Sequence, residues 1–179
     1  KVEVNSQALA TSNLSLAYYI YNKPVGIVTH SPQKGETDIL TAIKVGTDSR
    51  NANQLPSNIF PLGRLDKDSH GLILLTNDGR IIERLLTPTA NHEKEYLVKV
   101  DKPLKQNTLT RLAKGVKLED GYITKPAIIE GLGAYSLRLI ITEGKRHQIR
   151  RMLAALGYAV LDLERVRIMH IKLGNLKTG

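Results

Sequence analysis

The chain has 179 residues, enough for one domain or two small ones, and 41% of them are hydrophobic. No apolar run is long enough to span a bilayer, no secretory leader is evident, and the absence of cysteine excludes disulfides, thiolate catalysis and Cys-based zinc sites. The formal net charge of +9 favours a polyanionic partner, of which nucleic acid is the commonest. We therefore expect a cytoplasmic protein that binds nucleic acid and has no membrane association.

The first third of the chain is predicted to contain short strands separated by polar loops. Residues 1–16 are small and polar, and we interpret them as a linker or the remnant of an upstream domain, because the chain begins at Lys1 rather than Met. Apolar and β-branched residues bounded by Pro and Gly then predict strands over residues 17–24 and 26–30. Loops are expected over residues 31–36 and 46–58.

The middle of the chain is predicted to alternate between strands and short helices. Strands are expected over residues 59–65, 72–76, 96–100, 122–129 and 135–142. Helices are expected over residues 80–86 and 105–114, the second ending at Gly115.

The strongest helix prediction covers residues 147–156. Apolar side chains recur there at helical spacing, and Gly157 stands where a C-terminal cap belongs. A long strand is expected over residues 160–171. Because strands outnumber helices and do not alternate regularly with them, we predict an α+β fold with a mixed, largely antiparallel β-sheet and flanking helices.

Two carboxylates, Asp66 and Asp68, stand just before the apolar run 72–76. With Gly71 they match the start of a calcium-binding EF-hand loop, but position five is His70 and position twelve is Asn77, so that interpretation fails. A two-metal nuclease site needs more acids than the neighbouring strands offer.

Two interpretations of Asp66 remain from the residues alone. One is a surface ion pair with Arg64, which is worth little energetically. The other is a catalytic carboxylate at a strand end, kept ionised by a nearby guanidinium and able to act as nucleophile or general base.

A basic cluster precedes the predicted helix 147–156. Lys145, Arg146 and Arg150 surround its N-terminus, which itself favours anions. This arrangement predicts a docking site for phosphate groups. For His147 alone, a capping or packing role is the simpler interpretation.

Several motifs, taken in order, resemble the pseudouridine synthases of the branch that includes RsuA, RluB, RluE and RluF. They are Tyr21-Asn-Lys-Pro-Val-Gly26, Gly63-Arg-Leu-Asp-Lys-Asp-Ser69 followed by Gly71 to Asn77, His92-Glu-Lys-Glu-Tyr-Leu-Val98, Glu143 to Met152, and Leu163-Glu-Arg-Val-Arg-Ile-Met169. The first and last of these look most like the RluF type, and the resemblance extends from about Tyr18 to the C-terminus. It implies the pseudouridine synthase catalytic fold over residues 17–179, with residues 1–16 as a linker or the end of an S4-type RNA-binding domain.

The resemblance also implies roles for individual residues. Asp66 would be the catalytic aspartate, Tyr96 would lie against the target uracil, and Arg150 would pair with Asp66 and hold it charged. The implied substrate-binding residues are Arg64, Leu163, Lys23, Lys94, Lys145 and His147. No cofactor and no metal is implied.

The implied function is isomerisation of uridine to pseudouridine in ribosomal RNA, with large-subunit (23S) RNA favoured. The alternatives are small-subunit (16S) RNA, transfer RNA, or a noncatalytic RNA-binding module of the same fold. The target nucleotide would have to leave the stacked helix, because its sugar and base are otherwise out of reach. We expect a monomer whose partner is RNA.

Overall fold

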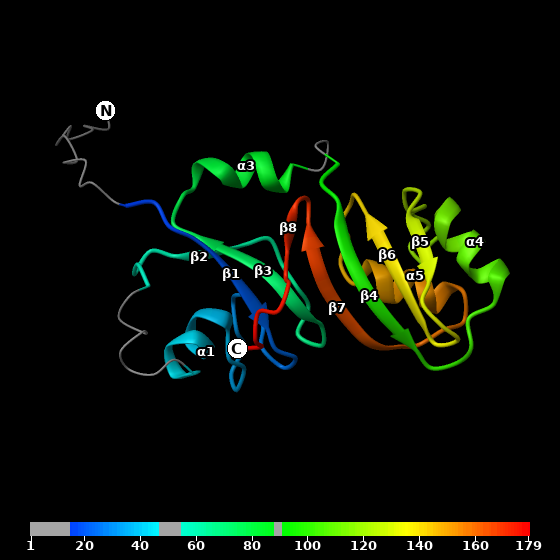
Figure 1. Ribbon diagram of the computed structural model, residues 1–179, viewed down its shortest axis with the longest axis horizontal. Coiled ribbons are helices and arrows are strands. Elements are labelled where there is room, and N and C mark those ends of the chain that lie inside the picture. The colour runs from blue at the N-terminus through cyan, green and yellow to red at the C-terminus, as the bar shows by residue number, and fades with distance from the viewer. Residues whose placement is uncertain (1–14, 47–54, 88–90) are drawn as a thin grey trace, which may run out of the picture.

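A computed structural model describes residues 15–46, 55–87 and 91–179. Its strands form one eight-stranded mixed sheet, which is drawn out along the long axis of the molecule in Figure 1. The strands are β1 (Tyr18–Lys23), β2 (Phe60–Leu62), β3 (His70–Thr76), β4 (Lys94–Val100), β5 (Ile128–Gly131), β6 (Ser136–Ile141), β7 (Val160–Ile168) and β8 (Ile171–Lys172). The helices are α1 (Ile39–Gly46), α3 (Arg80–Leu86), α4 (Gln106–Lys114) and α5 (Gln148–Ala155).

The order of strands across the sheet is β1-β3-β7-β4-β6-β5, with β2 added beside β3 and β8 beside β7. All pairs are antiparallel except β3 with β7, which meet over only His70↔Glu164 and Gly71↔Arg165. This short parallel contact joins the two ends of the sheet. The α+β prediction of a mixed, largely antiparallel sheet with flanking helices is confirmed.

Gly71 is required at this junction. Its φ is +103°, and a Cβ on it would collide with the backbone of Arg165. Only glycine tolerates both the left-handed backbone and the close approach of the neighbouring strand.

Three apolar clusters stabilise the sheet. The main one packs α4 and α5 against β4, β6 and β7, and it includes Leu65, Tyr96 and Leu163. A second packs α1 against β1 and β3 through Ile39 and Ile73. The third lies on the opposite face of β3, where Leu72 and Leu74 meet α3 and β8. Figure 1 shows α1 and α3 at one end of the sheet and α4 and α5 at the other.

Several element predictions need correction. Residues 26–30 form no strand and contribute only a bridge between Val28 and Asp38, because Gly26, at φ +88°, turns the chain away. The strand expected over 59–65 stops at Leu62, since Gly63 also has a positive φ. The strand expected over 122–129 starts only at Ile128, after a hairpin-like bridge.

The last predicted strand and the second loop also differ from the structure. Residues 160–171 do not form one strand, because Met169 adopts φ +50° and the chain folds back as β8. Helix α1 was not predicted, although Asp38 marks its start by accepting a hydrogen bond from Thr41 N at 2.8 Å. Most of the loop expected over 46–58, and residues 1–14 of the predicted linker, lie outside the described residues.

No helix among the described residues is long and apolar enough to cross a membrane.

Candidate active site

Asp66 lies in the turn between β2 and β3, and this turn is held by backbone contacts from the segment after β1. Gly26 N donates to Lys67 O at 2.8 Å. The buried Thr29 hydroxyl donates to Leu65 O at 2.7 Å and accepts from Leu65 N at 3.0 Å. Residues 21–26 and 63–69, which form two of the recognised motifs, therefore meet in space and fix the backbone on which Asp66 stands.

Lys23 supports the same turn from below. It is completely buried, and its Nζ donates to Pro24 O at 2.8 Å and Ile27 O at 2.7 Å, with Lys67 O at 3.5 Å. Burial lowers the pKa of Lys23 to about 8, against the opposing effect of the Asp66 and Asp68 charges. The enclosed ammonium group thus bonds the backbone of the turn, and the substrate-binding role of Lys23 stays a prediction.

Arg150, in the first turn of α5, reaches the same loop. Its Nη2 donates to Asp68 O at 2.7 Å and to Ser69 Oγ at 3.3 Å, and its Nη1 donates to Val160 O at 3.1 Å. The predicted ion pair with Asp66 is absent from the described contacts, since Nη1 and Nη2 face these oxygens and the buried Nε has no hydrogen-bond partner among the described residues. Arg150 therefore ties α5 and β7 to the turn that carries Asp66.

The group that contacts the Asp66 carboxylate is His147. Its Nδ1 lies 3.2 Å from Asp66 Oδ2, and both side chains are partly exposed. His147 stands immediately before α5 with φ +50° and ψ +27°, a left-handed conformation that is uncommon outside glycine.

Tyr96, Leu163 and Lys94 occupy one face of the sheet beside this turn. Tyr96 of β4 lies opposite Arg165 of β7, and Val98 lies opposite Leu163 in the same ladder. Tyr96 is 7% exposed and Leu163 4%, and both belong to the main apolar cluster with Leu65. Leu65, which precedes Asp66 in the chain, thus belongs to the same apolar cluster as Tyr96 and Leu163, which are predicted to contact the uracil.

Arg165 is a residue whose importance was not predicted. It is 3% exposed, and its Nε donates to Leu72 O at 2.7 Å while its Nη1 donates to Arg64 O at 3.1 Å. The pKa of Lys94 is lowered mainly by the burial of Lys94 itself, and further by the positive charge of Arg165. The only available signal was its position in the motif 163–169, directly after a buried leucine.

Arg64 and Lys145 present charge at the surface near this region. The Arg64 side chain is exposed, while its carbonyl is held by Arg165. Lys145 Nζ lies 4.7 Å from the centre of the Tyr122 ring. The loop that carries Lys145 is braced by buried Gln148, whose Oε1 accepts from Lys145 N at 2.9 Å and whose amide donates to Glu143.

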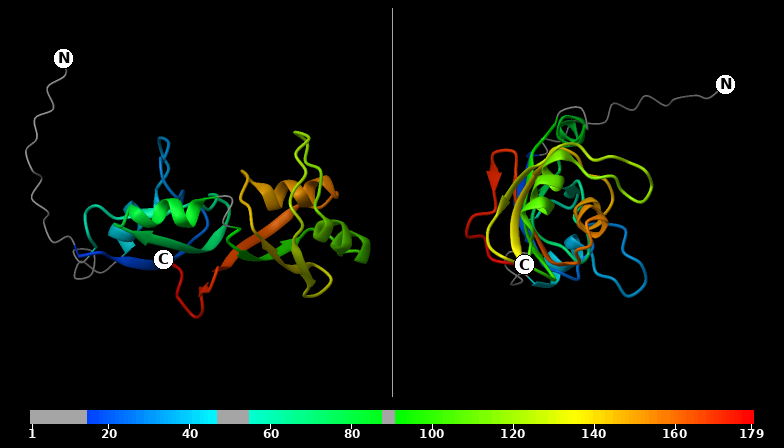
Figure 2. Two further views of the ribbon diagram at one scale, coloured as in Figure 1. Left: turned by 90° about the horizontal axis from the view of Figure 1, so that it is seen from above. Right: turned by 90° about the vertical axis from the view of Figure 1, so that its right-hand side faces the viewer.

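Loops project on the side of the sheet that carries α5. In the left view of Figure 2, the blue segment after β1 and the yellow-green segment after α4 rise on the same side as α5. Within residues 15–46, 55–87 and 91–179, no three His, Asp or Glu side chains gather in a way that could hold a metal ion.

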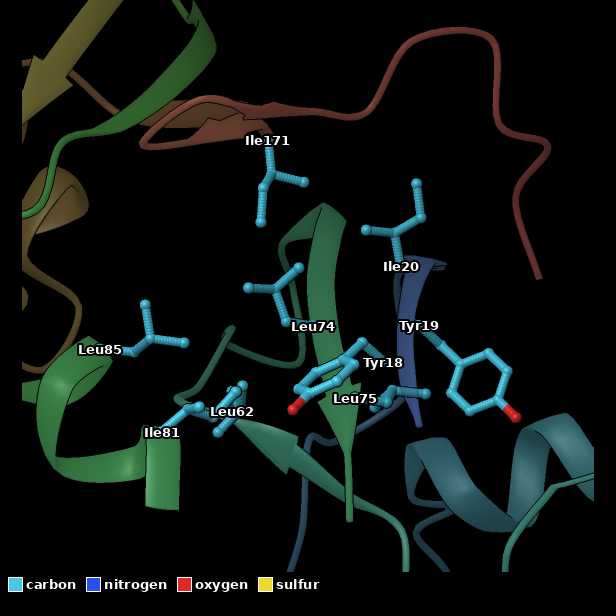
Figure 3. A pocket seen from close by; sticks show the side chains of 9 residues that line it. All are labelled: Tyr18, Tyr19, Ile20, Leu62, Leu74, Leu75, Ile81, Leu85 and Ile171. Carbon is cyan, nitrogen blue, oxygen red and sulfur yellow. The ribbon is translucent and has the colours of Figure 1, made fainter. Parts of the chain in front are cut away.

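An apolar pocket of about 210 Å³ lies away from Asp66. Figure 3 shows Leu62, Leu74, Ile81, Leu85 and Ile171 around it, with the ring of Tyr18 at its edge. No charged side chain lines this pocket, so it offers nothing for acid–base chemistry.

The arrangement around Asp66 has the elements of covalent or acid–base catalysis. The Asp66 carboxylate stands on a bonded turn and is contacted by His147, and the preceding residue, Leu65, belongs to the same apolar cluster as Tyr96 and Leu163. Cationic groups surround the site, as a polyanionic substrate requires.

Comparisons with known proteins agree with this geometry. A family model of RNA pseudouridylate synthases matches residues 17–155. The dual-specificity RNA pseudouridine synthase RluF of Escherichia coli (strain K12) is 38% identical over 179 residues, which cover 99% of this chain and 58% of that protein. Ribosomal small subunit pseudouridine synthase A of Salmonella typhimurium (strain LT2) is 38% identical over 164 residues, covering 90% of this chain and 68% of that protein.

A solved structure shows the same architecture. A crystal structure of a pseudouridylate synthase superimposes with a TM-score of 0.78 and 36% sequence identity, covering 91% of this chain and 67% of that one. The chain spans only 58% of the length of RluF. On the family match, the two relatives and this structure, the chain belongs to the RNA pseudouridine synthases of the RsuA/RluF family.

Proposed function

We propose that this chain isomerises uridine to pseudouridine in ribosomal RNA, acting in the cytoplasm as a monomer. The observation that supports the proposal is the turn that carries Asp66, which is held by the 21–29 segment and Arg150, and whose Leu65 packs in the same cluster as Tyr96 and Leu163. Residues 17–179 would form the catalytic domain, and residues 1–16 a linker or the remnant of an S4-type RNA-binding domain.

In the proposed reaction the bond between C1′ and N1 of uridine breaks and a bond between C1′ and C5 forms. C5 loses a proton and N1 gains one, so the reaction is balanced without cofactor or metal. Asp66 would act as a nucleophile or a general base on the ribose or the uracil. Tyr96 would lie against the uracil, where stacking contributes ~1–3 kcal/mol. The nucleotide must be flipped out of its helix to reach these groups.

RNA would be held by exposed cations around the turn and before α5. Arg64, Lys145 and Arg146 are exposed there, and Leu163 would line the uracil pocket. Lys94 is half-buried on the same face of the sheet as Tyr96, so it would contact the substrate only near the uracil. Phosphate contacts of this kind make binding weaken steeply as salt is raised.

Large-subunit RNA is the favoured substrate, because the motifs at residues 21–26 and 163–169 are most like the RluF type. Small-subunit RNA is the second candidate, since ribosomal small subunit pseudouridine synthase A has the same 38% identity as RluF. The two are separated by which transcript serves as substrate.

The test is release of tritium from RNA labelled at uridine C5, with wild type and Asp66→Asn run in parallel. We expect release by wild type and loss of at least about 1,000-fold in the variant, in which a neutral amide replaces the carboxylate. Large-subunit, small-subunit and transfer RNA are tested separately. Equal release by both proteins would refute the role of Asp66, and no release from any RNA would refute the proposed activity of this chain.

A further inference from the structure

The contact between His147 and Asp66 has no equivalent among the roles described above. We propose that His147 is a positioning residue, which orients the Asp66 carboxylate toward the flipped uridine. This inference rests on the proposed function and assigns His147 to the aspartate rather than to the RNA.

The first support is the choice of partner. Among the described side chains, His147 is the basic group that approaches the Asp66 carboxylate within 4.0 Å. Two other cations near the turn make their hydrogen bonds to other groups. Arg150 bonds Val160 O, Asp68 O and Ser69 Oγ, and Lys23 bonds three backbone carbonyls. The carboxylate therefore depends on the imidazole for its orientation.

The second support is the backbone of His147. A non-glycine residue in the left-handed region is strained, and such strain persists where the surrounding structure imposes it. The His147 side chain makes no capping hydrogen bond to α5, so a capping role does not explain the strained position. The left-handed turn instead places the imidazole against Asp66.

The third support is the rigidity of the loop that carries His147. On one side, buried Gln148 bonds Glu143 and the backbone of Lys145. Glu143 in turn accepts from Tyr122 Oη at 2.6 Å and from Lys125 N at 3.0 Å. A side chain on so firmly held a loop can fix the direction of another group.

The exposure of the His147 and Asp66 side chains distinguishes a positioning role from a structural one. The side chains of His147 and Asp66 are 44% and 31% exposed, and ion pairs at such positions contribute little to stability. Loss of the imidazole should therefore lower the rate without unfolding the protein.

The variant to test is His147→Gly, because glycine adopts the left-handed backbone without strain. In steady-state tritium release we expect kcat to fall about 10- to 100-fold, since a misplaced catalytic group costs rates of this order. KM for RNA should change less than about threefold, and the melting temperature should stay within about 2 °C of wild type. His147→Arg, which supplies a hydrogen-bond donor able to reach the carboxylate, should recover most of the lost kcat.

The matched control is His170→Gly, at an exposed histidine in the turn between β7 and β8. It should leave kcat and KM as in wild type. A rise in KM with unchanged kcat in His147→Gly would overturn the inference, because it would show that His147 serves RNA binding. A loss of kcat that His147→Arg does not recover at all would overturn it as well.

A second readout needs no RNA. The ¹⁵N signals of the His147 ring should move in Asp66→Asn and stay in place in Asp68→Asn. An unmoved signal in Asp66→Asn would overturn the inference even in an active enzyme. If the signal moves but the wild-type protein releases no tritium, then His147 and Asp66 do form a pair. The positioning role in catalysis would in that case be refuted together with the proposed function.

Discussion

Strand β3 has two very different neighbourhoods. On one face, Leu72 and Leu74 pack with α3 and β8 around an apolar pocket whose lining carries no charge. At the end of the same strand, Lys23 and Arg165 are buried with their cationic groups bonded to backbone carbonyls. Apolar burial stabilises the fold at roughly 25 cal/mol per Å², whereas a buried charge is costly and depends on its hydrogen bonds, of which Arg165 makes two while its buried Nη2 has no partner among the described residues. Stability and the accurate placement of Asp66 are therefore supplied by different regions.

The comparison is tested most strongly at Arg165. Arg165→Met should destabilise the protein by roughly 3–5 kcal/mol, because the carbonyls of Leu72 and Arg64 would lose their charged donor while remaining enclosed. Urea unfolding measures this. The control Arg138→Met, at an arginine that is 43% exposed and paired with Glu95 and Glu130, should change stability by less than about 1 kcal/mol. Equal effects of the two variants would show that the buried guanidinium contributes no more than a surface one.

The apolar region is tested at Leu74. Leu74→Ala should destabilise by about 2–3 kcal/mol through lost burial and an enlarged cavity. Activity per folded molecule should remain within about twofold of wild type, because the residue lies on the face away from Asp66. Leu161→Ala, at a leucine that is 63% exposed on β7, provides the control, with an expected change below about 0.5 kcal/mol. A large drop in kcat for Leu74→Ala would contradict the conclusion that the apolar region serves stability and not the placement of Asp66.

The buried charge of Lys23 gives a pH-dependent prediction. Its pKa is about 8 in the folded protein and 10.5 as a free side chain, so the unfolded chain binds more protons between these values. Stability should therefore rise with pH through this range, by an amount on the order of 2 kcal/mol relative to Lys23→Met. Chemical unfolding of both proteins across this pH range measures the difference. Lys99→Met, at an exposed lysine of β4, should follow the wild-type curve, and a wild-type curve parallel to that of Lys23→Met would contradict the prediction.

The smallest expected effect is at Thr29. Thr29→Val keeps the shape of the side chain but removes the hydroxyl that bonds both Leu65 N and Leu65 O. We expect a loss of about 1–2 kcal/mol and a lower kcat, because the turn carrying Asp66 would be less firmly held. Thr29→Ser should recover both quantities, and a Thr29→Val protein with wild-type kcat would show that the turn needs no such support.

Local pattern predicted most of the elements on the two flanks of the sheet. Helix α3 has the predicted bounds, and α4 and α5 lie within one residue of theirs, since apolar spacing and following glycines depend on near neighbours. Two of the errors fall where a single residue with positive φ interrupts an apolar run, as Gly63 and Met169 do. Met169 gives no compositional warning, because its conformation comes from the return of β8 onto β7.

The candidate site was only partly predictable for a different reason. Motifs pointed to Asp66, Tyr96 and Arg150 as neighbours, but not to the partner of each polar group. Arg150 and Arg165 are both arginines in recognised motifs, and their carbonyl partners are chosen by how α5 and β7 approach the turn. Such contacts join residues 80 to 100 positions apart in the chain and leave no local pattern.

The short parallel contact between β3 and β7 has a consequence for synthesis. Asp66 emerges early, but His147, Arg150 and Arg165 follow only near the end of the described chain, and they meet the Asp66 turn across that junction. Contacts between such distant residues form late, after the local pairs. A nascent chain that still lacks β7 thus lacks Arg165 and the parallel contact with β3, so we expect the proposed activity toward RNA only after this last long strand has docked.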